Sequence, residues 1–174
     1  QKYELAFVDV MHLAEFYENA KAQNMLGYLY CHGKGTEQDV EVAYEWFEQS
    51  IAQGFSAASI NMGNLLYTYG IDEETRASAH QFYFDCVEKT SVATAQRALE
   101  MCEDGLVENP EYQIVWKMRL TQLKQMDAVD EILEKFKSGI SDPECHLLIL
   151  DFVKELAQNG NENALALYRE SPKI

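Results

Sequence analysis

A pattern of about 36 residues occurs twice near the start of this chain, and no other feature limits the fold as strongly. Small and apolar residues recur at one spacing, Ala22, Leu26 and Gly27 returning as Ala58, Met62 and Gly63, so that the period is 63 minus 27, or 36. A second set recurs at the same offset, with Ala43, Trp46, Phe47 and Ile51 returning as Ala79, Phe82, Tyr83 and Val87. Intervals of three and four positions predict helices. A repeated helix pair predicts an α-solenoid, in which each pair packs on the next.

Two weaker copies extend the pattern along the chain. The third keeps Ala98, Leu99, Gly105, Val115, Met118 and Leu123, and the fourth keeps Ala128, Ile132, Leu133, Phe136, Gly139, Ile149, Phe152, Val153 and Ala157. We expect an all-α, right-handed α-solenoid of stacked antiparallel helix pairs, forming one repeat domain over 1–174. Its parts are a leading helix (1–18), four repeats (19–54, 55–90, 91–126 and 127–159) and a C-terminal capping helix (160–174).

The leading helix is expected to turn one apolar face inward, formed by Leu5, Phe7, Val10, Met11 and Ala14. In the repeat register it is a second-type helix without its partner, and the chain begins with Gln1 instead of Met. We therefore expect something upstream: a removed signal peptide, a cleaved tag or preceding repeats. Further helix starts are indicated by capping residues at Ser56, Asp72, Asn109, Asp127, Asp142 and Asn161.

The first copy resembles a known family. It reads Asn19-Ala20-x-Ala22-Gln23-x2-Leu26-Gly27-x2-Tyr30-x2-Gly33-x-Gly35, followed by Asp39, Ala43, Trp46-Phe47 and Gln53-Gly54. This resembles a Sel-one-like repeat, a relative of the tetratricopeptide repeat. Later copies depart from it at Tyr69, Thr90 and Arg119, where the first has Gly33, Gly54 and Phe47. The resemblance implies a solenoid that binds other proteins and implies no conserved catalytic centre.

The charge of the chain limits its partners. A net charge of −15 repels phosphate backbones and anionic lipids, so we expect no nucleic acid. No apolar run approaches the ~18 residues of a membrane-spanning helix, so we expect no membrane insertion. We therefore expect the partner to be another protein, which is basic by the same argument, or a peptide. The oligomeric state stays open.

An acidic stripe is the first candidate binding surface. Between Lys34 and Arg76 there is no lysine or arginine, and Glu41, Glu45 and Glu48 fall at i, i+4 and i+7 on one helix face. This spacing predicts either a docking face for a basic partner or an ordinary solvated face.

The inner face of the first-type helices is the second candidate surface, because solenoid curvature makes that face concave. Residues between the signature positions would be free to bind there: Asn24, Tyr28, Ile60, Asn64, Tyr67, Gln96, Glu100 and Glu103. Tyrosine beside amides and carboxylates is typical of binding grooves. Alternatively, some of these tyrosines pack between repeats.

Other chemistry finds little support. The sequence from His32 to Thr36 lacks the order of a phosphate-binding loop, and the pairs Cys31-His32 and Cys145-His146 are too far apart in a solenoid to share a zinc ion. We predict no catalytic residue, metal or cofactor. The cysteines at 31, 86, 102 and 145 form no CxxC pair, which favours reduced thiols and a cytoplasmic location. A periplasmic or secreted protein stays an alternative because of the missing N-terminus.

The function expected from these patterns is that of a non-catalytic interaction scaffold or adaptor. An acidic immunity protein or antitoxin that inhibits a basic toxin or effector is the alternative. A lesser alternative comes from the resemblance alone, because a few secreted members of that family are reported to bind or hydrolyse β-lactams. A fragment of a larger adaptor would also explain the start in the middle of a repeat.

Overall fold

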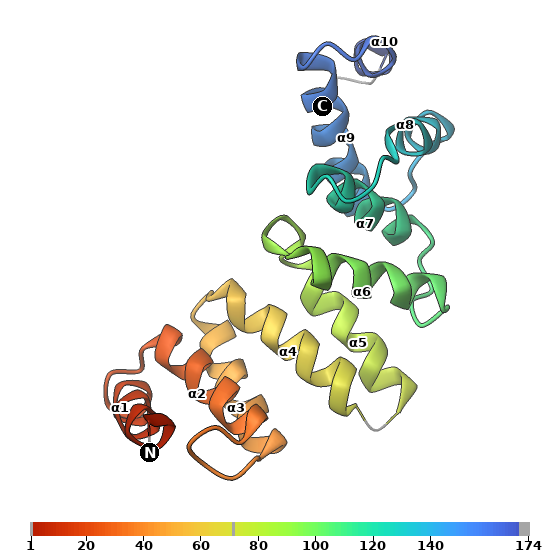
Figure 1. Ribbon diagram of the computed structural model, residues 1–174. Helices are drawn as coiled ribbons and strands as arrows, with labels where there is room; N and C mark the ends of the chain where they lie inside the picture. Colours follow the sequence, from red (N-terminus) through yellow and green to blue (C-terminus); the bar gives the residue numbers. More distant parts are fainter. Residues whose placement is uncertain (1, 71, 171–174) are drawn as a thin grey trace. The chain divides into compact units, whose positions relative to one another are not determined.

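The computed structural model describes residues 2–70 and 72–170, and within them the secondary structure is entirely helical (Figure 1). Side chains are described from Ala6 on, so the expected inward position of Leu5 lies outside the described residues. The helices are α1 (Lys2–Phe16), α2 (Ala20–His32), α3 (Val40–Ala52), α4 (Ser56–Tyr69), α5 (Glu73–Phe84), the 3-10 helix η1 (Val87–Lys89), α6 (Val92–Glu103), α7 (Glu111–Gln122), α8 (Val129–Ser138), α9 (Pro143–Gln158) and α10 (Glu162–Glu170). The all-α prediction is confirmed.

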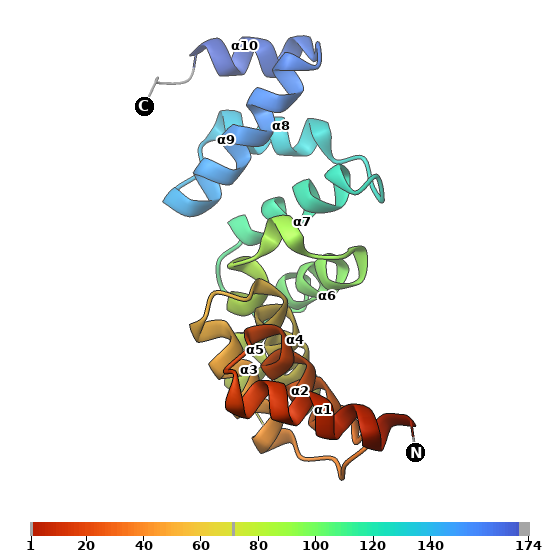
Figure 2. The same cartoon turned by 90° about the vertical axis from the view of Figure 1, so that its left-hand side faces the viewer.

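The chain divides into two compact units, residues 1–90 and 91–174. The boundary coincides with the one expected between the second and third repeats. In the first unit α1 packs on α2, α2 pairs with α3, α4 pairs with α5, and α3 joins the two pairs by packing on α4 (Figures 1 and 2). Each pair is one copy of the 36-residue pattern.

The core of the first unit is built by the signature positions. Three matching positions are fully buried in both copies, Leu26, Ala43 and Phe47 in the first and Met62, Ala79 and Tyr83 in the second. Trp46 and Ile51 are only half-buried, although the helical stripe predicts them as core. Ser50 is fully buried instead, because its hydroxyl donates a hydrogen bond to the carbonyl oxygen of Ala20 at 2.7 Å. The buried face of α3 is thus rotated slightly from the face that the apolar stripe predicts.

Turns and caps follow local residue chemistry. Gly33 ends α2 in the left-handed region, with φ of 61°, as the Gly-Lys-Gly turn predicts. Asn19, Asp39 and Asp72 each accept a hydrogen bond from the backbone N–H three residues on, which starts α2, α3 and α5. The prediction of Ser56 as a cap is wrong. It is the first residue of α4, and Phe55 before it makes no side-chain cap.

The second unit contains the weaker copies. Here α6 pairs with α7, and α7 packs on α8 and α9. The helix α10 lies against α9 and α8, at the top of both views (Figures 1 and 2). Val115 and Met118 are buried as expected, but the largest fully buried side chain of the chain's described part is Trp116.

A buried carboxylate, Glu111, joins α7 to the turn before α9. It accepts hydrogen bonds from the Ser141 N–H (2.9 Å), the Ser141 hydroxyl (3.0 Å) and the Asp142 N–H (2.7 Å). Lys135 lies 3.4 Å away. Burial alone raises the pKa of Glu111, but these hydrogen bonds together lower it to about 2. The carboxylate is therefore ionised at neutral pH and holds α7, α8 and α9 together.

Candidate protein-binding site

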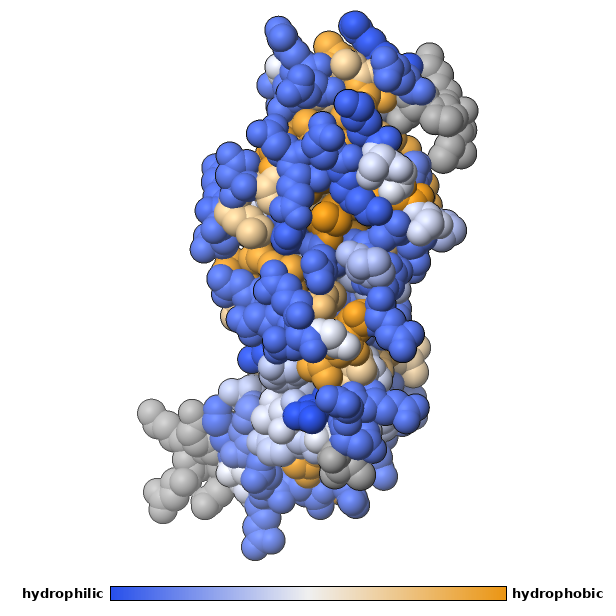
Figure 3. Space-filling view, turned by 90° about the vertical axis from the view of Figure 1, so that its right-hand side faces the viewer, coloured by the Kyte–Doolittle hydropathy of each residue, from blue (hydrophilic) through white to orange (hydrophobic). Residues whose placement is uncertain are grey.

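The acidic stripe lies on the exposed side of α3. Asp39 begins this helix by accepting a hydrogen bond from the Val42 N–H at 3.0 Å. From that start the helical repeat places Ala43 and Phe47 in the core and leaves Glu41, Glu45 and Glu48 exposed. The face shown in Figure 3 is mostly hydrophilic, and hydrophobic residues reach its surface only in smaller patches.

Two glutamates of the stripe border an apolar hollow. This α3–α4 hollow, of about 380 Å³, lies where α3 meets α4 and the beginning of α5. It is lined by Val40, Glu41, Tyr44, Glu45, Leu65, Leu66, Tyr69, Gly70 and Thr75. Most of its lining is aromatic or aliphatic, and Glu41 and Glu45 are its only charged members. Glu48 is not part of it. The hollow therefore offers an apolar floor beside two exposed carboxylates.

Tyr69 is held in place at one end of the hollow. Gln38, in the loop between α2 and α3, donates from Nε2 to the Tyr69 hydroxyl at 2.9 Å and to the Cys31 carbonyl at 2.8 Å. The tyrosine is nevertheless 39% exposed, so its ring is open to a partner. Our sequence reasoning did not identify it as a site residue. The signal was its position, because Tyr69 stands where the first copy has the turn residue Gly33.

The hollow is electrically negative. Neither Glu41 nor Glu45 is ion-paired with any residue in the described part of the chain. Beside them Asp72 caps α5, and the backbone hydrogen bond from Thr75 lowers the pKa of Asp72 below its usual value. Asp72 therefore keeps its charge at neutral pH.

The residues predicted to form a concave groove have internal partners in the first unit. Asn24 accepts a hydrogen bond from Asn61 at 2.8 Å, which joins α2 to α4. Tyr28 accepts one from Lys34 at 2.7 Å, and Asn64 accepts one from the Tyr83 hydroxyl at 3.0 Å. Ile60 and Tyr67 are half-buried. The Asn24–Asn61 contact joins two repeats, whereas the other two contacts each lie within one repeat. The role of these residues in binding stays a prediction.

The remaining groove residues belong to the other unit. Gln96, Glu100 and Glu103 are exposed on α6 in the second unit, whereas the other five groove residues lie on α2 and α4 of the first. The eight predicted residues are therefore divided between the two units, and a shared binding role for them stays a prediction.

The alternative chemistries gain no geometric support. Gly33 and Gly35 have φ of 61° and 81°, as a tight turn requires, and the turn follows a helix instead of the strand that a phosphate loop needs. Across the residues described, no group of His, Cys, Asp and Glu side chains is arranged to hold a metal ion. Nor does any helix in the described ranges combine the length and apolar composition that a membrane crossing needs.

One histidine, His80, and all four cysteines are buried. Burial lowers the pKa of His80 to about 4, so this histidine is neutral at physiological pH. Burial raises the pKa of Cys86 to about 11 and that of Cys102 to about 12. All four cysteines are buried and free. Thiols in this state are poor nucleophiles and metal ligands.

Comparison with known proteins identifies the family of the first copy. Residues 20–55, the whole of the α2–α3 pair, match the model of the Sel1 repeat. Residues 20–55 are a Sel1 repeat, and the chain has the Sel1 repeat fold. Sel1 repeats commonly mediate protein interactions. The search of curated proteins gave no match.

Solved structures extend this likeness to most of the chain. A Sel1 repeat protein from Oxalobacter formigenes matches with a TM-score of 0.58 and 22% identity, over 97% of this chain and 70% of that one. A protective antigen present in uropathogenic Escherichia coli strains, which displays the same fold, matches with a TM-score of 0.56 and 23% identity over 89% of this chain. This chain covers 33% of the antigen's length. At these identities the likeness establishes the Sel1 repeat fold.

Proposed function

We propose that this chain is a non-catalytic interaction module that binds a basic protein through the α3–α4 hollow. One observation carries the proposal: Glu41 and Glu45, two carboxylates without an ion pair in the described chain, border an apolar hollow that contains Tyr44 and Tyr69. An aromatic or aliphatic side chain fits such a floor, and lysine or arginine residues next to it would meet the two glutamates. Apolar anchors beside charged residues are the usual composition of protein-binding hot spots.

The charge of the chain indicates that the partner is positively charged. The chain has 29 acidic and 14 basic residues, and its net charge of −15 attracts a basic partner from a distance. The carboxylates at the hollow would then fix the partner's orientation, since charge complementarity acts mainly on association rate and register. An inhibitor of a basic toxin would use the same surface, so this is a special case of the proposed function.

The experiment uses a library of short peptides. Each peptide carries one aromatic or aliphatic residue flanked by lysine or arginine, and binding to the full chain is measured by fluorescence anisotropy at low and high salt. We expect the double variant Glu41→Lys with Glu45→Lys to weaken the selected peptides by at least about tenfold, which corresponds to ~1.4 kcal/mol.

A matched control separates the hollow from overall charge. The double variant Glu37→Lys with Glu48→Lys changes the net charge by the same amount at exposed residues outside the hollow. We expect it to change binding by less than about threefold, with Tyr69→Ala behaving like the first variant. Equal losses in both double variants would show that binding depends only on net charge and would contradict the proposed site.

A further inference from the structure

A second hollow lies on the other side of α3. It is formed where the end of α1 meets α2 and α3, and its volume is about 460 Å³. We call it the Trp46 hollow, and its polar and aromatic lining consists of Glu15, Glu18, Gln23, Trp46, Gln49 and Gln53. It shares no lining residue with the α3–α4 hollow. The function proposed above does not use it.

Three glutamine side chains make the frame of this hollow rigid. Gln23 is only 3% exposed. Its amide donates to Gln49 Oε1 at 3.3 Å and accepts from Gln53 Nε2 at 2.6 Å. Gln53 also donates to the backbone carbonyl of Glu18 at 2.9 Å, which ties the end of α1 to the end of α3. A frame that is ordered before a ligand arrives loses little entropy on binding.

Trp46 gives the hollow an aromatic wall. This residue is half-buried: it packs against the core cluster of Ala14, Ala22 and Leu26 and also lines the hollow. The core contacts fix the indole ring in one position. Tryptophan has the most favourable face for a cation among the aromatic side chains.

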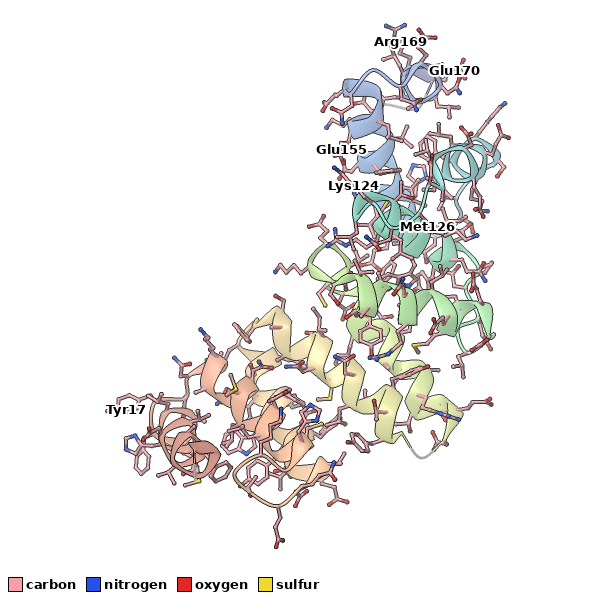
Figure 4. The ribbon with its side chains drawn as sticks, in the orientation of Figure 1. Tyr17, Lys124, Met126, Glu155, Arg169 and Glu170 are labelled. Atoms are coloured by element: carbon pink, nitrogen blue, oxygen red, sulfur yellow. The ribbon has the colours of Figure 1, made fainter. Side chains whose placement is uncertain are left out.

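The charges at the hollow are all negative. Glu15 and Glu18 are exposed, and neither is ion-paired with any residue whose side chain the structure describes. Glu18 lies directly after Tyr17, which Figure 4 shows on the outer side of the end of α1. A cation entering beside Trp46 would therefore meet two carboxylates and, around them, amide oxygens fixed by the glutamine frame.

We propose that the Trp46 hollow binds the guanidinium group of an arginine side chain from another protein. A planar guanidinium stacks on an indole and, with its five donors, bonds carboxylates at the same time. A lysine ammonium is a compact charge that is more strongly hydrated and has fewer directed donors. The volume accommodates one long side chain, and the mouth beside Glu15 and Glu18 faces solvent.

The test uses a blocked Gly-Arg-Gly tripeptide and two analogues. Citrulline replaces arginine in the first analogue, which keeps the shape but removes the charge, and lysine replaces it in the second. Binding to the full chain is followed through the two tryptophan indole signals in nitrogen-15 NMR spectra. Trp116 is fully buried in the second unit and acts as an internal reference. We expect the Trp46 signal alone to shift, with an arginine-peptide dissociation constant on the order of 1 mM.

The analogues and variants decide the outcome. We expect citrulline to bind at least about tenfold more weakly than arginine, and lysine several-fold more weakly. The variant Glu15→Gln with Glu18→Gln should lose about tenfold, whereas Glu41→Gln with Glu45→Gln, an equal charge change at the other hollow, should change affinity by less than about twofold. Equal binding of arginine and citrulline, equal binding of arginine and lysine, equal losses in the two variants, or no shift at Trp46 would each overturn the proposal.

Discussion

Gly63 of α4 lies directly against the ring of Tyr83 of α5. A Cβ atom added to the glycine would lie 2.7 Å from Cδ1 of that ring and 3.1 Å from the Ala79 carbonyl oxygen. The preceding repeat has the same arrangement, in which a Cβ on Gly27 would lie 2.7 Å from two ring carbons of Phe47 and 3.1 Å from the Ala43 oxygen. Each repeat of the first unit is thus closed by a glycine on its first helix and a buried ring on its second.

The first prediction concerns this glycine. A glycine inside a helix normally costs about 1 kcal/mol relative to alanine. We expect Gly63→Ala to destabilise the first unit instead, by about 1–3 kcal/mol, because the added methyl group overlaps a fully buried ring. Urea unfolding followed by Trp46 fluorescence measures the change. The control Ala57→Gly, at an exposed position on α4, should also destabilise, by about 1 kcal/mol.

A double-mutant cycle checks the cause. If the ring of Phe47 is what excludes a side chain at Gly27, then Gly27→Ala should destabilise less in a Phe47→Leu background than in the natural chain. Additive effects of the two substitutions would contradict the assignment.

The second prediction concerns acid and His80. The unfolded histidine has a pKa of 6.5, and burial lowers the folded value to about 4. Between these pKa values His80 binds a proton in the unfolded chain but not in the folded chain. The first unit therefore loses stability as pH falls from about 6.5 to about 4, by at most roughly 3 kcal/mol. Urea midpoints measured across this range should show the slope. His80→Phe should lack it, and an unchanged slope would mean that another group titrates.

The third prediction concerns Glu111 in the second unit. Its pKa is lowered from 4.5 to about 2, so the stability that its charge contributes is present above about pH 4.5 and is lost as pH falls towards 2. At pH 7 we expect Glu111→Gln to cost about 1–3 kcal/mol, because an amide cannot accept all the hydrogen bonds from Ser141 and Asp142. Trp116 fluorescence reports this unit. Retention of the acid slope below pH 4.5 in the variant would contradict the assignment.

The fourth prediction concerns two strained backbone positions. Glu18 and Lys124 have positive φ, 47° and 57°, at helix ends where Gly54 and Gly160 serve in other repeats. Figure 4 shows Lys124 in the turn after α7. Glycine adopts this conformation without strain, so we expect Lys124→Gly and Glu18→Gly each to stabilise by about 1 kcal/mol in thermal unfolding. Lys124→Ala, as a control, should not.

Glu18→Gly has a second expected effect. It removes a carboxylate from the Trp46 hollow, so it should weaken the arginine peptide about severalfold while raising the melting temperature. Lys124→Gly should raise the melting temperature and leave peptide binding unchanged. A Glu18→Gly variant with full affinity would mean that this residue takes no part in binding.

Sequence reasoning predicts the helices and their ends well because these depend on nearby residues. The helix pair α2–α3, the turn at Gly33 and the caps at Asp72 and Asp142 all follow from periodicity and turn chemistry. The 36-residue register also persists into α7, where Val115, Trp116 and Leu120 are buried as Ala79, His80 and Phe84 are in α5. The repeat period thus predicts buried positions across most of the chain from the pattern of the first copy.

The departure from the repeat pattern at Arg119 is accompanied by a second departure, on the first helix of the same repeat. The position of Gly27 and Gly63 becomes Leu99 in the third repeat, and the position of Phe47 and Tyr83 becomes Arg119. Where the first helix carries a leucine instead of a glycine, the second carries no ring. A sequence pattern scored one position at a time treats each change as an isolated exception.

The candidate sites could be predicted only in part. The exposed glutamates follow from helical spacing, but the hollow beside them depends on how far α3 stands from α4 and α5, which no local pattern contains. Tyr44 and Tyr69 therefore escaped notice. The half-buried state of Trp46 has the same origin, because it depends on where α1 packs against α2.

The position of α3 between the two hollows has a consequence for regulation. One helix of 13 residues supplies a wall to each of them, so local opening of α3 would remove both surfaces in a single step. A ligand in either hollow would stabilise the ordered state of α3 and so favour ligand binding in the other hollow. Slower exchange of the α3 amide hydrogens would report this stabilisation. Two binding events on opposite sides of a helix would then be linked through its order alone, with no change in its shape.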